Sequence, residues 1–69
     1  MFKEQFMKWV QYVGEFEARA RLARRGLGMS TIDQMVGGTY QHEPRGTNRI
    51  AITEEMSKDG FTLKDEGAA

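Results

Sequence analysis

An apolar heptad pattern runs without a break through the first 27 residues of this 69-residue chain. Between Phe2 and Leu27 the apolar positions recur at alternating spacings of four and three residues. This spacing places them on one stripe of an α-helix and is typical of helices that pair with other helices. Gly26 and Gly28 supply a C-terminal stop signal. The pattern therefore predicts one long helix over residues 2–26, roughly 36 Å in length.

The stripe also predicts how the chain associates. A domain of this size buries only about 60% of its unfolded surface, and the chain has no cysteine with which to form disulfides. Oligomerisation is then the expected source of added stability, and we expect a homodimer through the stripe. Bulky residues before Gly14 and alanines after it favour antiparallel pairing, large against small, although a parallel dimer stays open. The predicted dimer interface is Phe2, Phe6, Trp9, Val13, Phe16, Ala20 and Ala23.

The middle of the chain predicts a short second helix over residues 31–36. Ser30 is placed as its N-cap, because a serine side chain can accept a hydrogen bond from a free backbone amide. The glycine pair Gly37-Gly38 ends the predicted helix.

The remainder reads as extended chain. Within residues 39–53, Ile50 and Ile52 share one face of an extended chain and alternate with Arg49, Ala51 and Thr53. Pro44-Arg45-Gly46 is a turn signal, so the pattern predicts a β-hairpin. Residues 54–64 are predicted as a short C-terminal element, either a helical turn, which we slightly favour, or a strand. Residues 65–69 are expected to be a frayed tail. The predicted fold is a single small α+β domain over residues 1–64.

Composition restricts the function. Ten basic and ten acidic side chains cancel, so no overall field draws the chain to nucleic acid or to an anionic membrane. No apolar run approaches the ~20 residues of a transmembrane helix, and the N-terminus does not resemble a signal peptide. We therefore expect a cytoplasmic protein with no membrane partner.

The residues for catalysis or metal binding are scarce. With no cysteine and one histidine, the chain cannot build the usual thiolate or imidazole metal sites. His42 beside Glu43 could exchange protons, but no nucleophile motif accompanies the pair. We predict no catalytic residue, no metal and no cofactor, and hence a protein that is not an enzyme.

Four arginines crowd residues 19–25, directly behind Glu15 and Glu17. Such a basic helix face can contact phosphates. The glutamates, however, stand four residues before Arg19 and Arg21, the favourable order for ion pairs within a helix, and they would repel phosphate. We therefore favour contact with protein over contact with nucleic acid.

These observations predict a small non-enzymatic protein-interaction module, an adaptor or inhibitor, which acts as a homodimer on a larger macromolecular partner. A nucleic-acid-binding regulator that uses the Arg19–Arg25 face is one alternative, and a structural subunit of a larger assembly is another. Small stand-alone chains of this kind are common in bacteria and phages, which is the source we expect. Tyrosine and arginine are enriched in binding hot spots. The predicted partner-binding residues are Arg21, Arg25, Tyr40, His42, Arg45 and Arg49.

Overall fold

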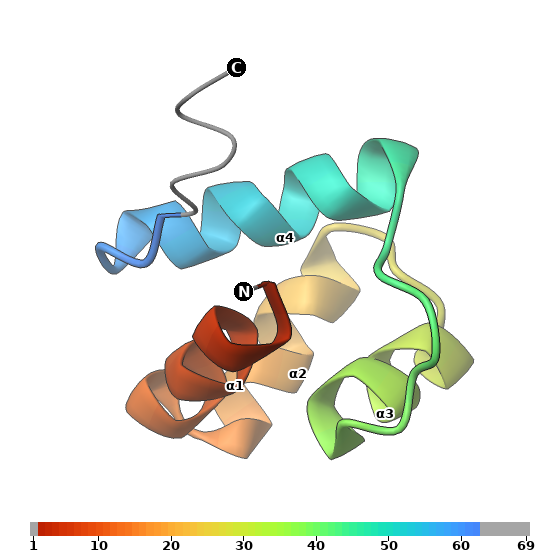
Figure 1. Cartoon of the computed structure of the whole chain (residues 1–69), viewed down its shortest axis with the longest axis horizontal. Helices are drawn as coiled ribbons and strands as arrows, with labels where there is room; N and C mark the ends of the chain where they lie inside the picture. Colours follow the sequence, from red (N-terminus) through yellow and green to blue (C-terminus); the bar gives the residue numbers. More distant parts are fainter. Residues whose placement is uncertain (1, 63–69) are drawn as a thin grey trace.

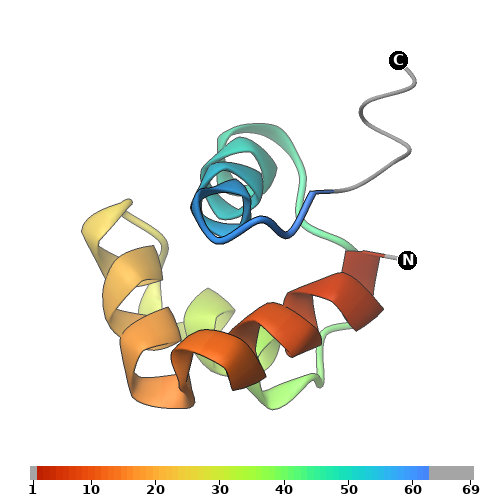
Figure 2. The same ribbon diagram turned by 90° about the vertical axis from the view of Figure 1, so that its left-hand side faces the viewer.

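A computed structural model of the chain describes residues 2–62 and shows four α-helices and no β-strand among them (Figure 1). The helices are α1 (Phe2–Val13), α2 (Glu15–Arg24), α3 (Met29–Gly37) and α4 (Gly46–Lys58). α2 packs against each of the other three. Seen from the side, α4 lies above α1 and α3, while α2 runs along one edge (Figure 2). None of these helices is long and apolar enough to cross a membrane.

α1 follows the heptad pattern and turns its stripe inward. Phe2, Phe6 and Trp9 are buried, with Val10 beside them. The Phe2 and Phe6 rings stack with centroids 5.9 Å apart, and Phe6 meets the Trp9 ring at 5.8 Å. Burial of each large aromatic side chain contributes about 2–3 kcal/mol. This half of the predicted stripe therefore forms the centre of the protein's own core.

The predicted single helix over residues 2–26 is wrong, because the chain bends at Gly14. Gly14 has φ +95° and ψ 144°, a conformation that glycine adopts readily and other residues rarely do. Its amide still donates to the Val10 carbonyl at 2.8 Å, and its carbonyl accepts from the Ala18 amide at 2.9 Å. The first bond closes α1 and the second opens α2, so Gly14 joins the two helices while the helix axis changes direction.

Beyond the bend, α2 buries a different face. Ala18 and Leu22 are fully buried, whereas Phe16, the next member of the heptad stripe, is 85% exposed. The helix ends at Arg24, Gly26 follows the C-cap residue with φ +90°, and the Leu27 amide donates back to the Leu22 carbonyl at 3.3 Å. This bond closes the helix end in the manner of a Schellman motif.

α3 contains the predicted short helix of residues 31–36 and extends it at both ends. Its C-terminus follows the prediction, because Gly38 is left-handed (φ 74°) and caps the Gln34 and Met35 carbonyls. The prediction of Ser30 as N-cap was wrong. The N-cap is Gly28, two residues earlier, and the helix begins at Met29 without a side-chain cap.

The predicted β-hairpin over residues 39–53, and with it the α+β fold, is contradicted by α4. Ile52 is fully buried while Ile50 is 57% exposed, so the two do not share a face. Residues 51, 52, 55 and 56 are the buried ones, which is helical spacing. The five-residue alternation around Ile50 was too short to separate strand from helix, and the predicted proline turn is a loop before Gly46.

The C-terminal prediction is resolved in part. Residues 54–58, at the start of the ambiguous 54–64 element, continue α4 as helix. Asp59 and Gly60 end it, with φ +87° at Gly60. Residues 63 and 64, and the predicted tail at 65–69, lie outside the described residues.

Candidate functional site

A network of ion pairs joins α2 to α4 and centres on Glu55, the buried charged residue of the core region. The Arg21 guanidinium donates to the Glu55 carboxylate at 2.8 Å, to the Glu55 carbonyl at 3.1 Å and to Asp59 at 3.0 Å. Trp9 reaches the same Asp59 carboxylate through its indole Nε1 at 2.9 Å. The Arg21 guanidinium also lies 5.3 Å from the centre of the Trp9 ring, within range of a cation–π contact.

Two further cations complete the shell around Glu55. Arg25 donates to the Glu55 carboxylate at 3.0 Å and also binds Glu54, and Lys58 donates to Glu55 at 3.1 Å. Burial acts to raise the pKa of the Glu55 carboxyl, but the hydrogen bonds from Arg21, Lys58 and Arg25 outweigh it and hold that pKa below its usual value. Glu55 is therefore charged in the folded protein, and its ion pairs connect α4 to α2.

Arg21 and Arg25, which the sequence predicts as partner-binding residues, thus have partners within the chain. Each guanidinium is engaged by carboxylates of α4. Arg19 is engaged as well, by Glu15 and by Asp33 of α3. Arg24 is exposed, and among residues 2–62 it has no ion-pair partner. Three of the four clustered arginines accordingly connect helices of the fold.

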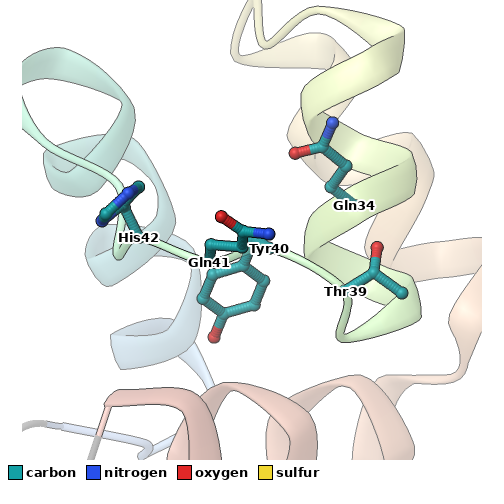
Figure 3. A pocket seen from close by; sticks show the side chains of 5 residues that line it. All are labelled: Gln34, Thr39, Tyr40, Gln41 and His42. Carbon is teal, nitrogen blue, oxygen red and sulfur yellow. The ribbon is translucent and has the colours of Figure 1, made fainter.

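The loop between α3 and α4 holds two more predicted partner-binding residues. Tyr40 and His42 line an open hollow of about 410 Å³, together with Gln34, Thr39 and Gln41 (Figure 3). The Tyr40 ring points towards α1 (Figure 3), and the Lys3 ammonium lies 5.3 Å from its centre. Burial, and then the charge of Glu43, raise the pKa of the Tyr40 hydroxyl. That hydroxyl is buried without a hydrogen-bond partner among the described residues.

The other two predicted residues lie at the start of α4. Arg45 is exposed as its N-cap. The Arg49 guanidinium lies 4.7 Å from the centre of the Phe2 ring and donates to Glu43 at 2.7 Å. Arg49 therefore covers one end of the aromatic core. The structure does not bring the loop residues together with Arg21 and Arg25, which line a separate hollow against Glu55.

A third hollow, between α2 and α3, is the apolar one, and we call it the α2–α3 groove. It has a volume of about 280 Å³ and is lined by Phe16, Arg19, Ala20, Ala23, Met29 and Ile32. Ile32 is fully buried, whereas Phe16 is 85% and Met29 65% exposed. Arg19, held by Glu15 and Asp33, ties the two helices together beside it. The groove is thus an apolar depression with projecting apolar side chains, between two helices that Arg19 connects.

The predicted dimer interface is divided between the core and this groove. Phe2, Phe6 and Trp9 are buried within the chain, and Val13 is partly buried against the core. The remaining predicted residues, Phe16, Ala20 and Ala23, line the groove. Sequence reasoning missed Met29 as their neighbour. The glycines after Arg25 were the available signal, because they return the chain alongside α2.

No family model, curated protein or solved structure matches this chain. Among residues 2–62, no three histidine, aspartate or glutamate side chains are grouped so that they could hold a metal ion. The candidate site is therefore defined by its own geometry.

Proposed function

We propose that this chain is a non-enzymatic protein-interaction module, an adaptor or inhibitor, whose binding surface is the α2–α3 groove. The observation that carries the proposal is the exposure of Phe16, 85%, at the edge of an apolar depression. A single exposed apolar residue is ordinary on a soluble protein, but a contiguous apolar patch marks an interaction site.

The shape of the groove favours a helical segment of a protein as its occupant. Two helices flank the depression, and apolar grooves of this kind accept the apolar face of an amphipathic helix. The alanines at positions 20 and 23 leave room for an incoming side chain, while Met29 can adjust to its shape. Phe16 would supply the buried aromatic anchor that dominates the energy of many protein interfaces.

The nucleic-acid alternative has less support. Phosphate binding needs cationic side chains that are free to neutralise the phosphates and so release the counterions of the nucleic acid. Arg19, Arg21 and Arg25 are each held by carboxylates of the same chain, so a phosphate would have to displace them. The remaining alternative, a subunit of a larger assembly, would use the same groove.

Site-specific photo-crosslinking in the native host tests the proposal. Benzoylphenylalanine is placed at Ala20 or Ala23 in the groove and, as controls, at the exposed residues Lys8 and Ser57. We expect the groove positions to yield a discrete protein adduct that the controls do not. The adduct partner is identified by mass spectrometry and then titrated, as purified protein, with the wild type and with Ala23→Glu. We expect Ala23→Glu to weaken binding at least tenfold.

Two results would contradict the proposal. One is crosslinking at Ala20 and Ala23 that does not exceed crosslinking at the control positions. The other is a groove adduct whose purified partner binds wild type and Ala23→Glu equally well.

A further inference from the structure

We propose that the protein seated on the α2–α3 groove is a second copy of this chain, in an antiparallel contact of α2 with α2 about a twofold axis. The inference rests on the proposed function, because it assigns the occupant of the same groove. It is carried by the distribution of large, small and charged side chains along one face of α2.

A symmetric contact requires a surface that is complementary to itself. The groove meets this requirement because it carries both a projection and a depression. Phe16 projects into solvent, 85% exposed, and the small side chains of Ala20 and Ala23 line the depression. The volume of about 280 Å³ is ample for a phenylalanine side chain.

The spacing along α2 sets the position of the twofold axis. Phe16 and Ala23 are seven residues apart, so they lie on the same face, roughly 10.5 Å apart along the helix. An axis that passes between Arg19 and Ala20 brings Phe16 of each copy opposite Ala23 of the other. Both depressions are then filled. A parallel contact would stack one Phe16 on the other and leave both alanine depressions empty.

The charges on one flank of the stripe favour the same orientation. Glu17 follows Phe16 and Arg24 follows Ala23, so both charges lie on the same flank of the stripe, at about 100° per residue. In an antiparallel pair with twofold symmetry, equivalent flanks face each other. Glu17 of each copy then approaches Arg24 of the other, which gives two symmetric ion pairs. Both side chains are exposed, and neither has an ion-pair partner among residues 2–62.

The global charge permits this contact. The formal net charge is zero, so two copies do not repel each other as a whole. The contact spans about two turns of α2 together with Met29 of α3, which places it among small interfaces. We therefore expect a reversible dimer with a dissociation constant in the micromolar range.

Sedimentation equilibrium of the purified full chain, from low micromolar to millimolar concentration, tests the proposal. We expect Phe16→Ser to weaken dimerisation at least tenfold. Ile50→Ser is the matched control, because Ile50 is also an exposed apolar residue, 57%, but lies on α4. It should leave the dimer unchanged. Circular dichroism establishes that both variants are folded.

A charge exchange tests the orientation. Glu17→Arg alone and Arg24→Glu alone should each weaken the dimer, because each opposes like charges. The double variant Glu17→Arg/Arg24→Glu should restore most of the wild-type affinity, because every ion pair is re-formed with its signs reversed. Failure of the double variant to recover would overturn the antiparallel contact.

The proposal of a second copy in the groove and the proposed function can be contradicted separately. A wild-type monomer at millimolar concentration, or a dimer that Phe16→Ser leaves intact, would overturn self-association through the groove. The photo-crosslinks at Ala20 and Ala23 would then decide whether the groove binds another protein. Groove adducts of twice the chain mass support both statements, and groove adducts with a different protein alone support only the proposed function.

Discussion

α1 and α2 carry the same four-three apolar spacing, yet their stripes meet opposite environments. Trp9 is completely buried, whereas Phe16, seven residues later on the same predicted stripe, is 85% exposed. Spacing determines which side chains share a helix face. It does not determine what that face contacts, because the direction of the helix axis decides that.

The axis changes at Gly14, and the burial of α2 changes with it. After the bend, Ala18 and Leu22 face the core and Arg21 faces α4. The apolar stripe of α2 is left pointing outward beside α3. The proposed binding surface is thereby made from residues that a straight helix would have placed in line with Trp9.

The largest difference between the two halves should appear in folding stability. Trp9→Ala should lower the free energy of unfolding by about 3–5 kcal/mol, because it empties the core and removes the hydrogen bond to Asp59. Phe16→Ala should change that free energy by less than about 0.5 kcal/mol. Chemical denaturation below the concentration of self-association measures both. Equal losses would contradict the division of the stripe between core and surface.

The ion pairs between α2 and Glu55 of α4 should give the next largest effect on folding stability. Glu55→Gln should destabilise the fold by about 3 kcal/mol, because Arg21 and Arg25 lose their shared buried carboxylate. Glu17→Gln is the control, since it removes an exposed carboxylate of α2 that lines the same hollow as Glu55. It should stay within about 0.5 kcal/mol of wild type. Urea titrations of the two variants test this pair, and a mild Glu55→Gln would show that the network contributes little.

The same carboxylate predicts a dependence of stability on pH. The pKa of Glu55 is lowered in the folded chain, so its contribution is present above the unfolded pKa of about 4.3 and is lost as pH falls through the folded value. As the pH falls from about 6 to roughly 3, wild type should therefore lose more folding stability than Glu55→Gln. Circular dichroism monitors unfolding of both proteins at each pH. Equal losses of stability in wild type and Glu55→Gln would exclude Glu55 as the source of the pH dependence.

Part of the fold could be read from the sequence. The two turns of apolar spacing around Phe6 and Trp9 predict α1 well, and the Gly37-Gly38 pair marks the end of α3 because Gly38 adopts the left-handed conformation there. α4 was missed for a physical reason. Ile50 and Ile52 favour a strand locally, while the burial of Ile52 and Met56 that selects a helix depends on core residues from the other helices.

The candidate site was predictable only in fragments. Phe16, Ala20 and Ala23 were predicted to bind a second copy, on a stripe that also included Trp9. Met29 and Ile32 line the same groove only because α3 folds back along α2. The roles of Arg21 and Arg25 depend on Glu55, which is thirty or more residues distant along the chain. No local pattern contains a contact over that separation.

Gly14→Ala tests the central claim, that a bend at Gly14 sends the two halves of one stripe to core and surface. Space is not at issue, since an added Cβ would meet nothing within 4 Å. At φ +95° the alanine should cost about 1–3 kcal/mol. Gly37→Ala is the control, because Gly37 lies in α3 with an ordinary φ and open space, and it should stabilise by up to about 1 kcal/mol.

The decisive measurement is the sign of the change in unfolding free energy for Gly14→Ala, determined by urea denaturation beside Gly37→Ala. The bend predicts destabilisation at position 14 and stabilisation at position 37. If both alanines stabilise the protein, Gly14 lies in a regular helix. Residues 2–26 would then form one continuous helix, and the division of the stripe would be contradicted.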